Sequence, residues 1–326
     1  TETVFVQRRG LRTISWSYER LVLVARQTAR ELQVRGIVQE DRVLLCGENS
    51  PEWAAAFWAC LMLGAVVVPL DKGGTRAFAV SVQQKTNAKL AFISNEADDV
   101  SILGVPQLRL DQLPEIVGSH STESLNVSKI SSNSLAQIIF TSGTTSTPKG
   151  VLLTHANLLA NLLPIEWETR KYLKWERFVH PVRFLSLVPL SHVFGQFMGL
   201  FVPQLIGAEV HFHNSLNPSE LVSRVRRDRL SVVVLVPRML ELLRQWLERS
   251  EDASILTQRI QSASNLNLLR KWWRFRRIHR MFGWKFWAFL SGGAGHPRAR
   301  SPDRAVPHGN ARVFCGDEDS TDARAD

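Results

Sequence analysis

Short apolar runs and amphipathic stretches alternate along the first third of the chain. The runs at residues 42–46, 66–68 and 90–94 have the length and β-branched content of buried strands. The segment before the first run, from Leu21 to Leu32, carries apolar residues with the period of an amphipathic helix, and further helices are expected between the runs. Strands that alternate with helices favour parallel pairing. The pattern therefore predicts an α/β fold of layered, mostly parallel sheets with helices on both faces.

Start and stop signals delimit these helices. Ser17 is placed to cap the first helix, Pro51 opens the second, and a third lies near residues 78–85. Residues 53–70 form an uncharged stretch that is long enough to span a membrane. Gly64 and the β-branched run after it instead indicate a helix, a turn and a strand, so we predict no membrane span.

The rest of the chain continues this alternation with longer interruptions. A polar, serine-rich loop is expected at residues 118–134 and an irregular segment at residues 165–180. Further strands are predicted at residues 11–15, 138–140, 151–153, 183–188, 209–212, 231–235 and 286–290, and further helices at 154–163, 194–205, 219–229 and from Pro237. A chain of 326 residues exceeds one ordinary core, so two lobes are expected.

The formal net charge of +10 comes mainly from arginines. Because no module that reads nucleic acid accompanies them, we expect a basic surface for anionic lipid or a polyanionic substrate, and no nucleic-acid partner. Cys46 and Cys60 lie in apolar runs, and the third cysteine, Cys315, adds no metal-binding spacing. We therefore predict buried thiols and a reducing, cytoplasmic compartment.

A loop rich in hydroxyl groups separates the strands predicted at residues 138–140 and 151–153. Glycine lets a backbone approach a polyphosphate, hydroxyls and amides donate hydrogen bonds, and lysine supplies a positive charge. The loop contains Thr141, Ser142, Gly143, Thr144, Thr145, Ser146, Thr147, Lys149 and Gly150. Pro148 and the following strand pattern distinguish it from a Walker loop, which runs into a helix. A surface hairpin turn is the alternative interpretation.

Residues 141–150 resemble the phosphate-loop signature Thr-Ser-Gly-Thr-Thr-Gly-x-Pro-Lys-Gly of the adenylate-forming superfamily. That superfamily includes acyl-CoA synthetases, luciferases and the adenylation domains of peptide synthetases. Ser146 stands where glycine is usual, which costs about 1 kcal/mol if the position needs a positive φ. The resemblance implies that the loop and Lys149 bind the phosphates of ATP, with Mg²⁺ bridging those phosphates.

Residues 187–195 resemble a second block of this family, in which a histidine lies beside the acyl pocket and the adenylate. The resemblance implies that His192 is catalytic together with Lys149, and that Phe194 and Gly195 border the substrate. Read alone, His192 would more often be a helix-start histidine bonded to the backbone. The apolar stripe that begins at Phe194 either lines an acyl tunnel or packs in the core.

Residues 291–294 resemble the Gly-Gly-Ala block of the family, where the backbone passes close to the adenine and the acyl carbonyl. This implies that Gly292, Gly293 and Ala294 line the adenylate pocket, since a side chain would fill the ligand's space. Residues 48–53 and 64–70 resemble earlier blocks, although a helix start, a helix end and a core strand explain them as well.

Residues 266–287 interleave aromatic and basic side chains. One interpretation is a solvated amphipathic helix whose aromatic residues pack on the core. The other is peripheral contact of residues 270–287 with an anionic membrane surface.

Composition changes after Ala294. Residues 295–326 contain no leucine, isoleucine, methionine, tryptophan, tyrosine or lysine. We therefore predict a disordered tail, with a composition like that of a sequence translated out of frame. The glutamate motif that binds magnesium in the family is missing there, and no metal ligand is identified. The resemblance covers residues 11–294, which predicts a partial AMP-binding N-terminal domain at 1–294, a truncation or frameshift near Ala294, and no C-terminal lobe.

The resemblance thus implies an acid–thiol ligase that uses ATP, Mg²⁺ and coenzyme A. A medium- or long-chain fatty acid is the expected substrate, while aryl acids and an acyl carrier protein as thiol acceptor remain open. The chain itself is expected to be inactive, because several charged groups of the site lie beyond residue 294 in the family. The alternative is a remnant that only binds nucleotide or a membrane surface.

Overall fold

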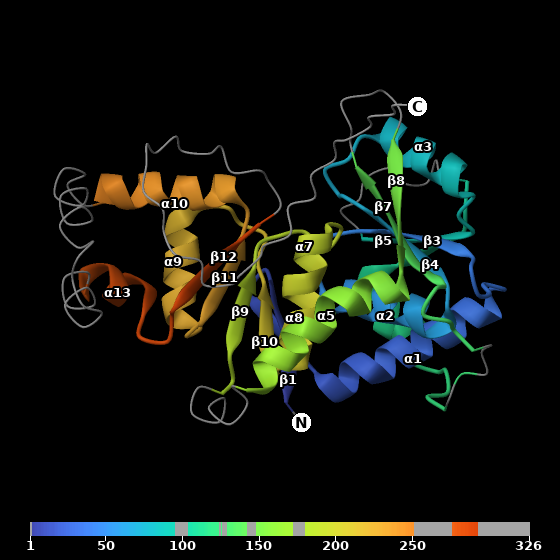
Figure 1. Ribbon diagram of the computed structural model, residues 1–326, viewed down its shortest axis with the longest axis horizontal. Helices are drawn as coiled ribbons and strands as arrows, with labels where there is room; N and C mark the ends of the chain where they lie inside the picture. Colours follow the sequence, from blue (N-terminus) through green and yellow to red (C-terminus); the bar gives the residue numbers. More distant parts are fainter. Residues whose placement is uncertain are drawn as a thin grey trace, which may run out of the picture. The chain divides into compact units, whose positions relative to one another are not determined.

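Two six-stranded sheets form the framework of the part of the chain that the computed structural model describes (Figure 1). The described residues are 2–94, 104–123, 125, 129–141, 148–171, 180–250 and 276–292. All of them belong to one unit, Thr1–Ala294. The predicted boundary at residue 295 and the predicted disorder beyond it lie outside the described residues and stay predictions.

Sheet A has the strand order β12-β11-β9-β10-β1-β2. Its strands are β1 (Thr3–Arg9), β2 (Arg12–Ser17), β9 (Arg183–Ser186), β10 (Glu209–Phe212), β11 (Val232–Leu235) and β12 (Ala288–Ser291). All neighbouring pairs are parallel except the hairpin β1–β2, in which Val6 lies opposite Ser15. The first strand of the chain therefore lies inside the sheet, with Phe5 opposite Val210 of β10.

Sheet B has the strand order β6-β5-β3-β4-β7-β8 and follows the same plan. Its strands are β3 (Arg42–Cys46), β4 (Val66–Leu70), β5 (Leu90–Ile93), β6 (Gln107–Arg109), β7 (Leu135–Thr141) and β8 (Lys149–Thr154). Parallel strands again end in one antiparallel hairpin, here β7–β8. The expected fold class of layered, mostly parallel sheets with helices is confirmed.

Helices separate and cover the two sheets. They are α1 (Tyr18–Val34), α2 (Pro51–Leu63), α3 (Arg76–Thr86), α4 (Leu113–Val117), α5 (His155–Arg170), α7 (Val193–Gln196), α8 (Val202–Leu205), α9 (Pro218–Arg227), α10 (Pro237–Ser250) and α13 (Arg276–Phe282), with a 3₁₀ turn η2 (Leu110–Gln112) and a π-helical turn η3 (Phe197–Phe201). The caps follow the sequence signals, because Ser17, Ser50 and Thr154 each accept a backbone N–H of the helix that they open.

The largest apolar cluster lies between the sheets. It joins one face of sheet A, including Phe5 and Phe184, to one face of sheet B, including Val43 and Phe92, through helices α1 and α2. The second face of sheet A packs with α9, α10 and α13, and the second face of sheet B packs with α3. The result is a helix–sheet–helix–sheet–helix layering, which places helix α2 among buried neighbours on nearly all sides.

The uncharged stretch at residues 53–70 is a helix, a turn and a strand, as predicted. Helix α2 ends at Gly64, whose φ of 76° is a left-handed cap, and β4 follows directly. Among the residues that the structure describes, no helix has both the length and the apolar composition needed to cross a membrane. Cys46 and Cys60 are buried, also as predicted, and burial raises the pKa of their thiols to about 11 and about 12.

Two local predictions were wrong or incomplete. Helix α5 does not stop at Leu163 but continues through Pro164 to Arg170. Pro164 and Ala160 are both exposed, so the carbonyl that loses its partner at a helical proline can be hydrated. Strand β1 was missed, because its pairing with β10 is not visible in the local sequence.

Candidate active site

The hairpin β7–β8 carries both ends of the predicted phosphate loop. Thr141 at the end of β7 lies opposite Lys149 at the start of β8, and Phe140 lies opposite Gly150. The loop residues Ser142, Gly143, Thr144, Thr145, Ser146 and Thr147 lie outside the described residues. Lys149 is exposed, which leaves its ammonium group accessible to an anionic ligand.

Gly150 is required for packing in this hairpin. A Cβ atom at this position would lie 3.0 Å from Ile138 Cγ2 and 3.0 Å from Phe140 Cζ. The cross-strand aromatic ring therefore occupies the space that a side chain would need. Lys85 of α3 donates from Nζ to the carbonyl oxygen of Pro148 at 2.8 Å, which fixes the returning end of the loop.

His192 lies where β9 gives way to helix α7. Its side chain is 57% exposed and its backbone N–H donates to the carbonyl oxygen of Pro189 at 3.1 Å. Gly195 permits this tight entry, because an added Cβ would collide with the same carbonyl oxygen. The predicted helix at 194–205 is present but contains the π-helical turn η3, a feature often found at functional sites.

Asp71 approaches His192 from the other sheet. It follows β4 directly, and its Oδ2 lies 3.8 Å from His192 Nε2. The interaction with His192 is the main reason why the pKa of the Asp71 carboxyl lies below its ordinary value, and burial opposes this effect. The carboxyl ends of parallel strands are where α/β sheets place ligands, so the position of Asp71 is a signal that sequence reasoning overlooked.

Asn49 holds the segment that precedes His192. Its Nδ2 donates to the carbonyl oxygen of Val188 at 2.8 Å, and its Oδ1 accepts the N–H of Leu190 at 2.7 Å. Its own carbonyl oxygen accepts from Gln7 Nε2 at 3.0 Å. Because Asn49 follows β3, this buried amide connects sheet B to the histidine segment of sheet A. The sequence predicted a helix start here and a resemblance to an early family block, but not this contact.

A second buried amide pair connects the two predicted motifs. Gln137 of β7 donates from Nε2 to Oε1 of Gln196 on α7 at 2.9 Å, and both side chains are fully buried. Gln137 lies on the same strand as Thr141, which ends that strand. Gln196 is the last residue of α7, the helix that His192 caps. The hydrogen bond therefore fixes the stem of the phosphate loop against the histidine helix.

The end of β12 packs against this helix. A Cβ atom at Gly292 would lie 2.7 Å from the ring of Phe194, so only glycine fits there. This brings together two residues that were predicted to line the adenylate pocket. Gly293 and Ala294 lie outside the described residues.

The contacts thus assemble His192, Phe194, Gly195 and Gly292 in one place and connect them to the hairpin of Thr141, Lys149 and Gly150. Within the described part of the chain, no three histidine, cysteine or acidic side chains converge in a way that could hold a metal ion. Residues 270–275 lie outside the described residues. Farther along that stretch Phe282 is buried, while Trp284 and Trp287 are exposed. Membrane contact through 270–287 stays a prediction.

The chain is similar to a known protein family and to characterised relatives. A family described as AMP-binding enzyme matches residues 2–300. The medium-chain fatty-acid–CoA ligase of Escherichia coli (strain K12) is 30% identical over 263 residues, which cover 74% of this chain and 45% of that protein. The mitochondrial malonate–CoA ligase ACSF3 of Homo sapiens is 29% identical over 256 residues, covering 75% of this chain and 43% of that protein.

The fold is also similar to that of solved structures. ATP-bound MatB from Rhodopseudomonas palustris superposes with a TM-score of 0.61 at 24% identity, over 74% of this chain and 48% of that one. The chain therefore spans less than half the length of each of these relatives. The family match covers most of the chain and agrees with the resemblance read from the phosphate-loop, histidine and glycine segments. The chain belongs to the AMP-binding enzyme family, whose members include acyl-CoA ligases.

Proposed function

We propose that the chain takes part in the ATP-dependent activation of a carboxylic acid. In this reaction a carboxylate oxygen attacks the α-phosphorus of ATP, and pyrophosphate leaves with the electron pair of the broken P–O bond. A thiolate then attacks the acyl carbon of the adenylate, and AMP leaves. The observation that carries the proposal is the Gln137–Gln196 hydrogen bond, because it holds the phosphate-loop hairpin and the histidine helix in one rigid arrangement.

Lys149 is the charged group that we assign to the phosphates of ATP. It stands at the mouth of the hairpin opposite Thr141, and it is exposed. A lysine ammonium placed there stabilises the charge that develops on departing pyrophosphate. The hydroxyl groups of residues 141–147 are proposed to add hydrogen bonds to the same phosphates.

His192 and Asp71 are proposed to act at the other end of the nucleotide, near the carboxylate and the α-phosphorus. Asp71 is ionised at neutral pH and orients the imidazole from 3.8 Å. The exposed ring can then donate a hydrogen bond to the acyl or phosphate oxygen. The missing side chain of Gly292 leaves room for the ring of Phe194 next to this end of β12.

Magnesium is expected to enter with ATP. The described residues offer no cage of three ligands, so Mg²⁺ would be coordinated mainly by phosphate oxygens and water, as it prefers. It would neutralise phosphate charge there. Coenzyme A is the proposed thiol acceptor, and an acyl carrier protein is the alternative.

A medium- or long-chain fatty acid is the substrate that we favour. Phe194, Phe197 and Met198 follow His192 and remain partly accessible, whereas Phe201 of the same stripe is buried. An accessible apolar stripe next to the proposed acyl site suits an alkyl chain. The named relative that acts on a medium-chain fatty acid supports this choice, while the malonate–CoA ligase shows that other acids occur among relatives.

The first experiment measures ATP binding to the 326-residue chain by isothermal titration calorimetry. Lys149→Gln is expected to weaken binding ~10-fold, because a charge-assisted contact to phosphate is lost. Lys89→Gln is the matched control, since Lys89 precedes β5 at the opposite end of sheet B and pairs with Asp41. Equal binding by wild type and Lys149→Gln would contradict the assignment of the loop.

The second experiment measures ATP–pyrophosphate exchange with octanoate, palmitate, ferulate and malonate. We expect this chain to bind ATP without measurable exchange, and a longer protein that contains it to exchange with a fatty acid. Exchange with ferulate alone would replace the fatty-acid proposal by an aryl-acid ligase. Robust exchange by the 326-residue chain would show that it is a complete catalyst.

A further inference from the structure

A cleft separate from the candidate active site lies on sheet A, between the β1–β2 turn and helix α9. Its volume is about 610 Å³. One wall is formed by Arg8 at the end of β1, and the other by residues on one face of α9: Ser219, Ser223, Arg224 and Arg227. The floor is the chain that leaves β10, including His213. An adjoining hollow of about 450 Å³ is lined by the same three arginines.

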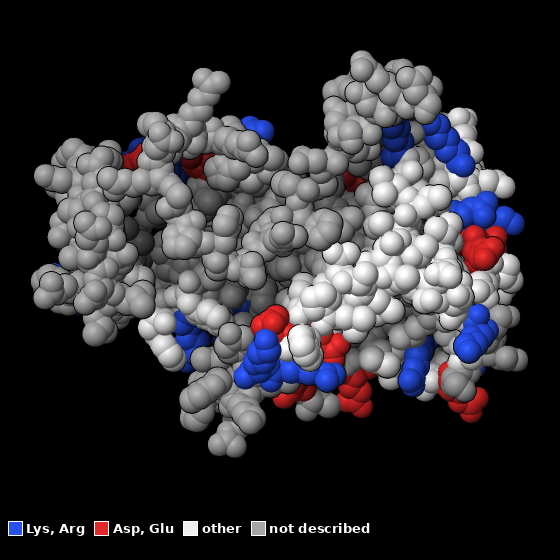
Figure 2. Space-filling view, in the orientation of Figure 1, with Lys and Arg blue, Asp and Glu red and all other residues white. Residues whose placement is uncertain are grey.

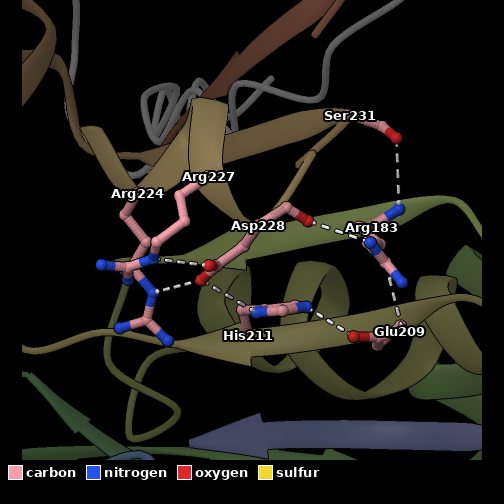
Figure 3. A network of polar contacts seen from close by, with 7 residues as sticks. All are labelled: Arg183, Glu209, His211, Arg224, Arg227, Asp228 and Ser231. Carbon is pink, nitrogen blue, oxygen red and sulfur yellow. Dashed lines mark hydrogen bonds and ion pairs between the residues drawn. The ribbon is translucent and has the colours of Figure 1, made fainter. Parts of the chain in front are cut away.

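Two of these arginines share one carboxylate. Arg224 donates from Nε to Asp228 Oδ2 at 3.1 Å, and Arg227 donates from Nε to Asp228 Oδ1 at 3.0 Å (Figure 3). The Nδ1 atom of His211 lies 3.8 Å from the same carboxylate. A single negative charge therefore faces two guanidinium groups, one of which is nearly buried, with 7% of its side chain exposed.

Arg8 adds a third positive charge from across the cleft. Its Nε donates to the carbonyl oxygen of Gly10 at 3.1 Å, and none of the ion pairs among the described residues involves Arg8. Burial is the main cause that lowers the pKa of Arg224, and the charges of Arg227 and Arg8 lower it further while Asp228 opposes them. The cleft thus brings three cations together against Asp228 and Glu220.

The other polar groups of the cleft can donate hydrogen bonds. Arg224 donates to His213 Nδ1 at 2.8 Å, which leaves the proton of the neutral ring on Nε2. Burial, followed by Arg224, lowers the pKa of His213 to about 4, so this ring is neutral at pH 7. Its buried Nε2 has no acceptor among the described residues. Ser223 adds a hydroxyl group, whereas the hydroxyl group of Ser219 donates to Asn217 Oδ1 at 2.9 Å.

We propose that this cleft binds a phosphorylated small molecule, with its phosphoryl oxygens between Arg8 and Arg227. Guanidinium groups bind phosphate in a bidentate manner, and an anionic ligand offsets the one positive charge by which Arg8, Arg224 and Arg227 exceed Asp228 and Glu220. The hydroxyl group of Ser223 donates to a remaining oxygen. The volume exceeds that of inorganic phosphate and falls in the range of small-molecule sites, so the natural ligand is an organic phosphate monoester. This site does not depend on the proposed ligase function.

The test uses the full chain carrying Lys149→Gln, which suppresses phosphate binding at the nucleotide loop. Inorganic phosphate and ribose 5-phosphate are titrated by calorimetry at fixed ionic strength. We expect saturable binding at one site, tighter for ribose 5-phosphate. Arg8→Gln and Arg227→Gln should each weaken this binding by ~10-fold, because each removes a charge-assisted hydrogen bond.

Arg12→Gln is the matched control, since Arg12 lies on the neighbouring strand β2, is exposed and does not line the cleft. It removes the same charge and should leave binding unchanged. Circular dichroism spectra and melting temperatures show whether each variant is folded. Unsaturable binding, or equal weakening by Arg12→Gln and Arg8→Gln, would show non-specific attraction and overturn the proposal. Loss of all phosphate binding in the Lys149→Gln background would overturn it as well.

Discussion

Helix α9 directs Leu221, Val222 and Val225 into the core, whereas helix α5 exposes Leu159 and Trp167 to solvent. Helix α9 is the shorter helix, with 10 residues against 16. Its last turn is held by the ion pairs of Asp228, and those contacts reach strands β9 and β10 through Arg183, Glu209 and His211 (Figure 3). Helix α9 is thus fixed by apolar packing and by charge.

Helix α5 is held to the rest of the chain by apolar packing, without an ion pair to another helix or strand among the described residues. Among its residues only Leu158 is buried, while Leu159, Leu163 and Trp167 are 48%, 56% and 71% exposed. Val151 and Leu152 of β8 are exposed as well, and Figure 2 shows few charged side chains between β8 and the first half of α5. Contiguous exposed apolar surface favours association with another surface. The two helices differ in that the apolar residues of α9 are buried within this chain, whereas most of those of α5 are exposed.

The largest expected effect concerns the charges that hold α9. Arg224→Met should lower the free energy of unfolding by about 4 kcal/mol, because Asp228 loses a guanidinium partner that is nearly buried. Urea denaturation followed by circular dichroism measures this change. Arg227→Met is the control, since its side chain is 55% exposed and its ion pair is expected to contribute less than about 1 kcal/mol. Equal effects of the two substitutions would refute the role given to burial.

The next largest change in the free energy of unfolding is expected at Leu158 of α5, which is compared with its neighbour Leu159. Leu158→Ala should cost about 3 kcal/mol, because it leaves a cavity in the core, whereas Leu159→Ala should cost less than about 0.5 kcal/mol. The same denaturation experiment compares the two variants. A similar cost at both positions would mean that the exposed face of α5 is covered in solution.

Acid should destabilise the packing around α9 more than the packing around α5. The pKa of His213 is lowered from 6.5 to about 4, so the unfolded chain takes up this proton first as the pH falls. The stabilisation is therefore present above about pH 6.5 and is lost between about pH 6.5 and 4. The charged groups that act on His213 are Arg224, Glu220, Asp228 and Arg227.

His213→Gln should flatten the pH dependence of unfolding across this window. His155 at the start of α5 also has a pKa lowered by burial, so His155→Gln is the natural comparison and should flatten the curve less. Melting temperatures measured from pH 4 to pH 8 distinguish the two. An unchanged slope in His213→Gln would show that this histidine is accessible to protons in the folded state.

The smallest effect on stability is expected at Trp167. Trp167→Ser should change the free energy of unfolding by less than about 0.5 kcal/mol, because the ring is 71% exposed. Self-association measured by sedimentation velocity should nevertheless decrease, since the substitution removes the largest exposed apolar side chain of α5. A monomeric wild-type chain at all concentrations would contradict the expected association.

The sequence was sufficient for the parallel framework and for the motifs, because both are local patterns. The apolar runs at β3, β4 and β5 and the caps at Ser17 and Ser50 predicted the elements at their observed places. The phosphate-loop stem and His192 were predicted from the resemblance of residues 141–150 and 187–195 to family motifs, which include Gly150 and Gly195. Both glycines have close neighbours that explain the absence of a side chain.

What the sequence did not reveal are contacts between distant segments. Asp71 and His192 approach each other from different sheets, and Asn49 holds a loop about 140 residues later. Gln137 and Gln196 show no local signal, because a glutamine in an apolar pattern reads as a solvent-facing position. Their pairing arises only when the sheets pack on a common helical layer. The motifs thus indicated the chemistry, and the tertiary contacts determine how it is positioned.

The place of β1 inside sheet A has a consequence for synthesis on the ribosome. Strands β3, β4 and β5 of sheet B follow one another within residues 42–93 and can pair as soon as they emerge. Phe5 of β1 pairs with Val210, about 200 residues later. At roughly 5–20 residues per second, the partner strand appears about 10–40 s after β1. The strand that leaves the ribosome first is therefore among the last to be incorporated, and until then its backbone edge is open to other chains.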